Sequence, residues 1–339
     1  MGLALRKEKI LSAVVEKYIE TGEPIGSKSL QTEKDLGVST ATIRNELKAL
    51  DDEGYLYQPH TSAGRIPTKT GYRYYIDNLM QAATLPERLR ENIEDGIRSG
   101  TRTPEHILSR AVSVLAQLTG AASAATTPSS DEARVHRIRF VSTGRHTSMA
   151  VLVTSNGMVK SRLFRCEYVL TPQLLSMFDK AINEAFAGVR LTDVTKGYLQ
   201  SVASGMGELT LFVPDVLIAI YEAVQNALEI SVTVAGQTNL LFSDAYDFDK
   251  ARRMMRFLGD TKEISGLLNN SRSHKVYLSE ESKIPELTGS AVIVARYEIA
   301  GENAGAVAVI APLRTNYRVI TSEVIYAAGC VSRAIGDFL

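Results

Sequence analysis

Apolar residues recur at helical spacing along the first fifty residues of the chain. Their periodicity predicts a helix over 5–20, a short helix over 27–34 and a third over about 39–53. Ser39 is a favourable N-cap for the third helix, because its hydroxyl can accept a hydrogen bond from a first-turn amide, and Gly54 ends that helix. Three short helices with a tight turn before the third are the order of a helix-turn-helix.

The third predicted helix has an apolar face and a polar face. Ile43, Leu47 and Leu50 are spaced so that they share one side and should pack on the first two helices. The other side then carries Arg, Asn and Lys, with hydroxyls in the first turn. Arg can bind guanine and Asn can bind adenine through two hydrogen bonds, whereas hydroxyls and helix-start amides suit phosphate. A merely solvated polar face is the alternative. The helix residues predicted to contact DNA are Ser39, Thr40, Thr42, Arg44, Asn45 and Lys48.

A basic segment follows the third helix. A strand is predicted over 55–57, then a turn with Gly64 at its tip, then a fourth helix over 71–80. No acidic residue lies between positions 57 and 75. Such a hairpin can approach the sugar-phosphate backbone, and Arg65 beside the tip can enter a minor groove. The alternative is a hairpin that only caps the domain. The residues of this segment predicted to contact DNA are His60, Thr61, Ser62, Gly64, Arg65, Lys69, Tyr72 and Arg73.

The rest of the chain predicts a mixed α+β fold. After two helical segments over 85–118 come β-rich runs with hairpin turns, and further helices are predicted at about 172–187, 214–229 and 320–338. Strands interleaved with helices in this way are typical of an α+β domain with a largely antiparallel sheet. A mixed pattern over 190–245 interrupts that domain and predicts an insertion. Alternating apolar positions predict a half-buried sheet, namely Phe140, Val151, Val153, Val292, Val294, Val307 and Val309.

Two features of this half allow two interpretations each. The apolar stripe of the predicted helix over 214–229 suits either a partner surface or the core of its own domain. Arg314, Asn316 and Tyr317 stand between the last predicted strand and the last helix. They either converge on a small ligand or form a loop cap, and the cap is the commoner arrangement.

Composition narrows the classes of function. The chain has 38 basic and 38 acidic residues, so its net charge is zero and any DNA-binding surface must be local. Cys166 and Cys330 lie far apart and are expected to be buried structural thiols. The five histidines are scattered without ligand spacing, so neither a metal site nor a cofactor is predicted. No nucleophile motif or phosphate-binding loop is present, which argues against an enzyme.

The chain shows no targeting signal at its start. The first ten residues have no apolar leader pattern, and the longest apolar runs have the length of strands, well short of the roughly 20 residues of a membrane helix. The sequence therefore predicts a cytoplasmic protein with no membrane partner.

The N-terminal motifs carry a resemblance to a known family. The segments GEPIGSKSL and LGVSTATIRNELKALDDEGYLYQPHTSAGRIPTKTGYRYYID are similar to the start of the HrcA family, heat-inducible transcription repressors of bacteria. QPHTSAGRIPT followed by GYRYY is the most specific part. The similarity continues more faintly in LTGAASAA, AVLVTSNGMVKSRL, VAGQTNLL and APLRTNY, and it is loosest after Leu241 and in SEESKIPELTGSAVIVARYEIAG.

The resemblance implies a function and a set of partners. HrcA-like proteins bind double-stranded DNA as homodimers, at an inverted-repeat operator called CIRCE, and repress chaperonin and DnaK-system operons. Their active form depends on the GroEL-type chaperonin. Bound to its operator, such a repressor is associated with the nucleoid. A small-molecule-sensing transcription regulator of a different regulon is the alternative.

The resemblance also implies an architecture. It places a winged helix-turn-helix over 1–83, linker helices and the first part of a GAF-like antiparallel-sheet domain over 84–189, an inserted dimerisation domain over 190–246, and the second part of the GAF-like domain over 247–339.

Overall fold

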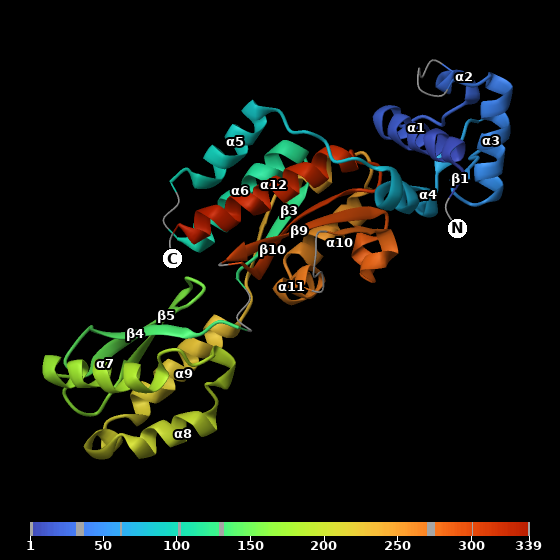
Figure 1. Cartoon of the computed structure of the whole chain (residues 1–339). Helices are drawn as coiled ribbons and strands as arrows, with labels where there is room; N and C mark the ends of the chain where they lie inside the picture. Colours follow the sequence, from blue (N-terminus) through green and yellow to red (C-terminus); the bar gives the residue numbers. More distant parts are fainter. Residues whose placement is uncertain are drawn as a thin grey trace.

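The computed structural model describes residues 3–31, 37–61, 63–100, 103–128, 132–269, 275–299 and 301–337. Within them the chain is a mixed α+β protein whose sheets are antiparallel and have two, five and three strands. Figure 1 shows three units in a row: an N-terminal helical unit, a central unit built on the five-stranded sheet, and an inserted unit at the opposite end.

The N-terminal unit has the element order that the apolar periodicity predicts. A left-handed Gly22 (φ 75°) ends the first helix. The second helix ends at Leu30, with Gln31 as its C-cap, and residues 32–34 of the predicted helix lie outside the described part of the chain. Buried side chains of the three helices share one core with the short hairpin. The elements are α1 (Leu5–Thr21), α2 (Ser27–Leu30), α3 (Thr40–Asp52), β1 (Leu56–Tyr57), β2 (Ile66–Pro67) and α4 (Lys69–Tyr74), continued by a π-helical turn over Tyr75–Leu79.

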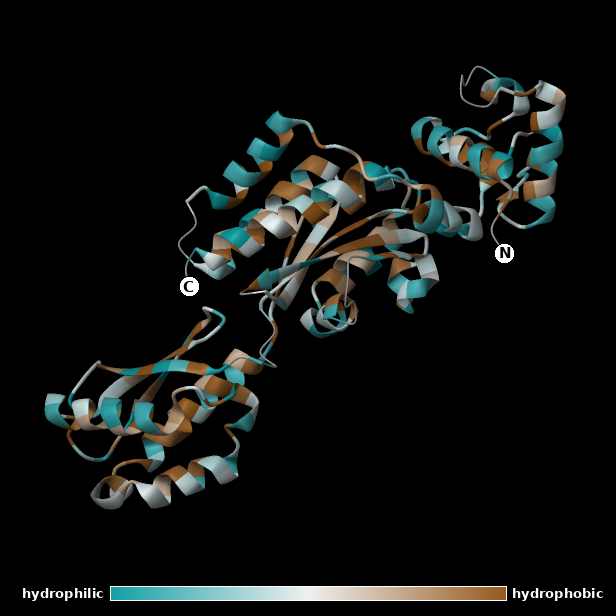
Figure 2. Cartoon of the chain, viewed as in Figure 1, coloured by the Kyte–Doolittle hydropathy of each residue, from teal (hydrophilic) through white to brown (hydrophobic). Residues whose placement is uncertain are grey.

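The central unit is a sheet covered on both faces. Its strands run in the order β7 (Val232–Ala235), β3 (Ala122–Thr126), β10 (Glu302–Pro312), β9 (Ser290–Ile299) and β8 (Lys275–Leu278). On one face lie α5 (Glu87–Arg98), α6 (Pro104–Thr119) and α12 (Tyr317–Gly336), and on the other lie a 3-10 turn over Gln237–Phe242, α10 (Phe248–Leu258) and α11 (Thr261–Asn269). Figure 2 shows apolar residues along these strands and on the helices over them.

The expectation of a half-buried sheet is wrong for the central strands. Ile293 and Ala295 of β9 pack in the core with α6 and α12, whereas Val292 and Val294 pack in the core with α10 and α11. All four are at most 1% exposed. Period-two alternation therefore separates two buried faces here, because helices cover both sides of the sheet.

The last helix has the length and composition of a membrane span but packs as a core helix. Among the described residues α12 is the one helix that meets this test, with half of its apolar window buried. Ala327, Cys330 and Val331 on its inner face are 0% exposed. Cys166 and Cys330 are both free and buried, and burial raises the pKa of each thiol, as expected for structural cysteines.

The inserted unit is larger than the sequence predicts and begins earlier. The strands β4 (Val135–Ser142), β5 (Thr147–Thr154) and β6 (Val159–Arg165) pair only with one another among the described strands. They share a separate core, from Ala133 to Leu228, with α7 (Pro172–Phe186), α8 (Lys196–Gly205) and α9 (Pro214–Leu228).

The predicted division of the chain at 190 and 246 therefore differs from the structure. The strands assigned to the first part of the central domain belong to the insertion. Residues 232–235 return to the central sheet, and residues 237–242 form a turn on its face. Alternation shows that a segment is a strand but not which sheet it joins. Where the chain leaves and re-enters the central unit, the Thr127 amide donates to Ser231 O at 2.9 Å.

Candidate nucleic-acid interface

The orientation of α3 follows from its cap and its buried face. The Ser39 hydroxyl accepts a hydrogen bond from the Thr42 amide at 3.2 Å, which starts the helix at Thr40. Ile43, Leu47 and Leu50 are 0%, 5% and 0% exposed and lie in the core of the N-terminal unit. These contacts confirm the predicted inner face.

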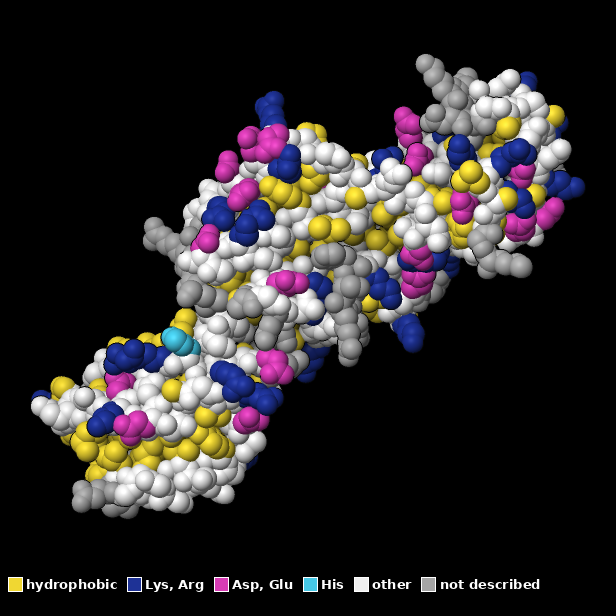
Figure 3. All heavy atoms as spheres, viewed as in Figure 1, with side chains coloured by type: hydrophobic (Ala, Val, Ile, Leu, Met, Phe, Trp, Pro, Cys, Tyr) yellow, Lys and Arg dark blue, Asp and Glu magenta, His cyan; other side chains and the backbone are white. Residues whose placement is uncertain are grey.

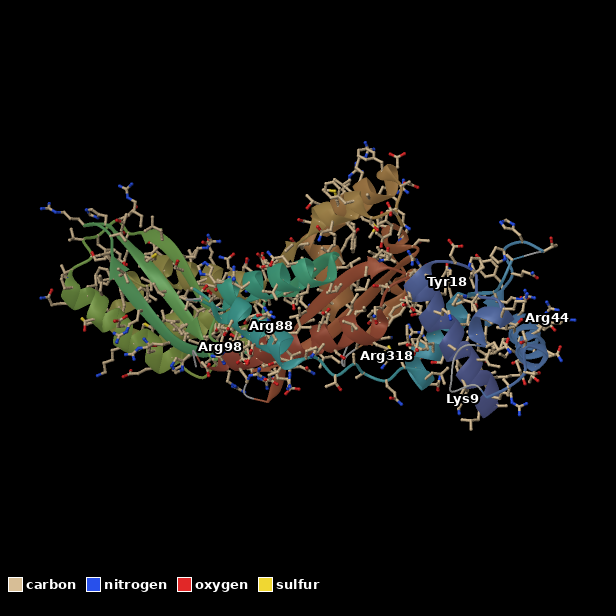
Figure 4. The ribbon with its side chains drawn as sticks, turned by 90° about the horizontal axis from the view of Figure 1, so that it is seen from above. Lys9, Tyr18, Arg44, Arg88, Arg98 and Arg318 are labelled. Carbon is tan, nitrogen blue, oxygen red and sulfur yellow. The ribbon has the colours of Figure 1, made fainter. Side chains whose placement is uncertain are left out.

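The outer face of α3 presents hydrogen-bonding and basic groups to solvent. Arg44, Asn45 and Lys48 are exposed. The acidic residues of α3 lie at its middle and its end, at Glu46, Asp51 and Asp52. Figure 4 shows Arg44 at the end of the molecule farthest from the central sheet. This row of donors is therefore open to a large ligand such as a duplex, while its contact with DNA stays a prediction.

The hydroxyls at the start of α3 already have partners within the protein. Thr40 Oγ1 donates to Gln31 Oε1 at 2.7 Å, which ties the first turn of α3 to the end of α2. The hydroxyls of Ser39 and Thr42 lie 2.9 Å apart. Ser39 is exposed and the two threonines are half-buried. They order the helix start, and any contact with DNA must be compatible with these bonds.

The hairpin after α3 is folded back on the N-terminal unit. Gln58 Nε2 donates to the carbonyl oxygens of Thr61 and Ala63, both at 2.9 Å, and holds the turn closed. His60 and Thr61 are exposed there. Ser62, a predicted DNA contact, lies outside the described residues.

Gly64 is not the exposed tip that the sequence predicts. The backbones of Ile25 and Arg65 pair through hydrogen bonds of 2.9 and 2.8 Å. A Cβ atom on Gly64 would lie 2.4 Å from the Ile25 carbonyl carbon. Glycine is needed here because two backbones meet, not because the chain approaches DNA.

Arg65 is turned inward as well. Its Nε lies 2.7 Å from Asp51 Oδ2, and the side chain is 18% exposed. Arg65 is therefore engaged by Asp51 in this structure, and its entry into a minor groove stays a prediction. The segment is free of acid along the sequence, but α3 supplies the carboxylate in space. Lys69, the first residue of α4, is exposed.

Tyr72 and Arg73 both contact the central unit, Tyr72 as a buried residue and Arg73 as a half-buried one. Tyr72 is 2% exposed, and its ring centroid lies 5.8 Å from that of Tyr317. Burial raises the pKa of Tyr72. Arg73 Nη2 donates to Glu281 Oε2 and to Val276 O, both at 2.7 Å. In this structure α4 turns both residues toward the sheet, and their contact with DNA stays a prediction.

Sequence reasoning missed Lys28, which is exposed on α2. In a helix-turn-helix the helix before the reading helix crosses the DNA backbone, where a lysine neutralises phosphate. The signal was present in the segment GEPIGSKSL, which precedes the predicted turn. Figure 3 shows basic and acidic side chains interspersed over the face in view, in keeping with a local rather than a general basic surface.

The loop before α12 forms a cap, one of the two arrangements that its sequence allows. Asn316 Oδ1 accepts from the Val319 amide at 3.2 Å, and the Tyr317 hydroxyl donates to Leu313 O. Arg314 Nη1 donates to Ile19 O at 3.1 Å and lies over Gly22, at the end of α1. The stripe of α9 likewise faces its own core: Val216, Leu217 and Ile220 are at most 4% exposed.

Comparisons with known proteins agree with these features. The family model described as "HrcA protein C terminal domain" matches residues 105–320. A heat-inducible transcription repressor HrcA of Lachnoclostridium phytofermentans is 30% identical over 95% of this chain and 94% of its own length. Its counterparts in Clostridium perfringens and Alkaliphilus metalliredigens are each 31% identical, covering 94% and 100% of this chain and 94% and 98% of their own lengths.

A solved structure has the same fold. The crystal structure of a protein described as hypothetical matches with a TM-score of 0.64 at 24% sequence identity and covers 100% of both chains. The match in fold and the match in sequence thus extend over the same near-complete length. The chain belongs to the HrcA family, whose curated members are heat-inducible transcription repressors.

Proposed function

We propose that this protein represses transcription by binding a CIRCE-type inverted-repeat operator upstream of chaperonin and DnaK-system operons. The N-terminal unit acts as a winged helix, with α3 in the major groove. One observation carries this proposal: Arg44, Asn45 and Lys48 form an exposed row on α3, opposite a fully buried apolar face. Arg44 and Asn45 read bases, and Lys48 neutralises phosphate.

Around α3 we propose contacts from residues with exposed side chains. His60 and Thr61 in the closed turn and Lys69 at the start of α4 are exposed and remain candidates for the DNA backbone. Lys28 on α2 joins them. A single module of this size buries about 600–1,000 Å² on DNA, which is little for operator-grade specificity, so two copies are needed.

The inserted unit supplies a surface for a homodimer. The face of its three-stranded sheet that points away from α7 and α9 carries Val141, Met149 and Leu163 in one cross-strand row, of which Val141 and Leu163 are 46% and 65% exposed. Val159 on the same face is 54% exposed. The same face also carries the exposed Arg137, Arg139 and Arg165, so its apolar row lies among basic groups. An apolar row of this kind fits a second copy related by a twofold axis, as an inverted repeat requires.

The central unit is the GAF-like domain of this proposal, and the GroEL-type chaperonin is the partner that maintains the active repressor. Apolar surface suits such a partner, and Phe242 and Phe248 beside α10 are 84% and 71% exposed. When denatured protein occupies the chaperonin, repression lapses. A repressor of this kind works in the cytoplasm and is associated with the nucleoid while bound.

A mobility-shift titration tests this function. The full chain is titrated against a CIRCE-type inverted repeat and against a scrambled duplex of the same composition, with and without chaperonin. We expect tight binding to the repeat alone, improved by chaperonin. Equal affinity for the two duplexes would contradict sequence-specific repression. If chaperonin changed the affinity for neither duplex, the proposed activation route would be contradicted.

A further inference from the structure

The N-terminal unit meets the central unit through an apolar contact. Tyr72 of α4 packs against Tyr317 of α12, and the two side chains are 2% and 0% exposed. Both belong to the core that the two units share. Among the described residues the Tyr72 hydroxyl is buried without a hydrogen-bond partner, so this contact rests on apolar packing and gives little directional restraint.

Two hollows adjoin this contact. One, of about 550 Å³, lies between α4 and the edge strand β8, and its lining includes Arg73 and Glu281. The other, of about 690 Å³, lies between α1 and the start of α12, and its lining includes Glu16 and Arg318. Figure 4 shows Arg318 where the N-terminal unit approaches the central sheet. Because side chains do not fill these spaces, polar groups that cross them help to set the angle between the units.

Among the polar groups that cross between the units Arg73 makes the tightest contact, since Arg314 of the central unit makes a single bond, from Nη1 to Ile19 O of α1, at 3.1 Å. Its Nε and Nη2 donate to the two carboxylate oxygens of Glu281 at 3.1 and 2.7 Å, and Nη2 also donates to Val276 O at 2.7 Å. On its own helix, Nη1 donates to Asp77 at 2.9 Å. Arg318 and Glu16, by comparison, approach to 3.7 Å. A planar guanidinium held in a two-pronged pair fixes direction as well as distance.

We propose that Arg73 is a positioning residue for operator recognition. Its pair with Glu281 sets the angle of α3 relative to the rest of the protomer, and thereby the spacing between half-sites that a dimer accepts. Figure 1 shows why the angle matters: the N-terminal unit and the inserted unit lie at opposite ends of the chain. With the dimer contact at one end and α3 at the other, a rotation at the junction changes the separation of the two reading helices. This inference rests on the proposed function.

The test is a spacing series. The wild-type chain and Arg73→Ala are titrated against the inverted repeat with its natural spacer and with spacers lengthened by two and by five base pairs. Two base pairs rotate one half-site by roughly 70° about the duplex. We expect the wild type to lose about tenfold or more in affinity, the equivalent of one base contact, on each altered spacer. For Arg73→Ala we expect the differences between spacers to shrink to within about threefold, whatever its overall affinity.

Three variants make the result specific. Glu281→Gln removes the charge but keeps an oxygen for the Leu278 amide, which donates to Glu281 Oε2 at 2.9 Å. It should therefore reduce the differences in affinity between spacers without disturbing β8. Arg73→Lys should restore part of the preference. Arg98→Ala breaks a comparable ion pair away from the junction, in which Arg98 Nη1 lies 2.8 Å from Asp337 Oδ2. It should leave the spacing preference as in the wild type.

The outcomes separate this inference from the proposed function. An unchanged spacing preference in Arg73→Ala and Glu281→Gln would overturn the positioning role, even if their affinity fell. A wild-type chain that fails to bind the repeat at any spacing would overturn the proposed function and the positioning role with it.

Discussion

The outer face of α3 and the segment over 60–73 differ in how their sequence relates to their structure. Both are rich in basic and hydroxyl side chains, and both are predicted to contact DNA. In α3 the polar row is exposed, with Arg44 at the end of the molecule. In the second segment Arg65, Tyr72 and Arg73 are turned toward other parts of the protein.

The difference lies in what sets the direction of each side chain. A helix with three buried residues on one side fixes the direction of every other side chain by its 3.6-residue period. In a turn and a six-residue helix, tertiary contacts set the direction of the side chains. Here Arg65 pairs with a carboxylate of α3, Arg73 pairs with a carboxylate beside β8, and Tyr72 packs on a ring of α12. Charge along the sequence is therefore a weak guide to exposure outside regular elements.

The largest expected effect concerns Tyr72. Because its ring is buried against Tyr317, Tyr72→Ala should cost about 3–5 kcal/mol of stability, as removal of a buried aromatic ring does. Tyr72→Phe should leave stability and operator affinity unchanged, since the hydroxyl has no partner in the described part of the chain. Denaturant titration and mobility shift measure the two. A marked loss of operator affinity in Tyr72→Phe, with stability intact, would indicate that the Tyr72 hydroxyl contacts DNA.

Arg44→Ala tests the exposed row. We expect it to cost about 1–3 kcal/mol on operator DNA and much less on random DNA, because a base contact is lost. Arg88 is exposed on α5, far from α3 in Figure 4, and Arg88→Ala is the matched control with no expected change. Equal losses for Arg44→Ala on both duplexes would assign Arg44 to phosphate instead of bases.

Gly64→Ala sharpens the same comparison through stability. The added methyl group would meet the Ile25 backbone at 2.4 Å, so we expect a loss of about 1–3 kcal/mol, as overpacking gives. Gly266, exposed in α11 with open space around it, is the control, and Gly266→Ala should leave stability unchanged or raise it by about 0.5–1 kcal/mol. Thermal unfolding of both variants provides the measurement. A Gly64→Ala protein of wild-type stability with weakened DNA binding would indicate that Gly64 lies at an exposed tip that approaches DNA.

The smallest expected effect is on salt dependence. Lys28→Ala should weaken binding to operator and random DNA alike and reduce the slope of log affinity against log salt by about 0.9, the value of one phosphate contact. Titrations at several salt concentrations measure this slope. An unchanged slope would mean that Lys28 does not contact a DNA phosphate.

Local patterns predicted the ends and faces of individual elements well. The buried row of α3, its Ser39 cap and the β9–β10 hairpin follow from spacing and residue type, whereas the sequence left two interpretations for the segment around Asn316. The limits of the inserted unit did not, because β4, β5 and β6 alternate like the central strands while they pair in a separate sheet. Pairing depends on contacts between distant parts of the chain, which alternation does not encode.

The sequence by itself determined which residues α3 offers to solvent, and its motifs pointed to the family that the comparisons then showed. Only the tertiary structure decided that Arg65 pairs with Asp51, that Gly64 meets Ile25, and that Arg73 reaches Glu281. The physical reason is range. Helix periodicity and capping are set within about four residues, whereas ion pairs and close backbone contacts join groups that folding alone brings together.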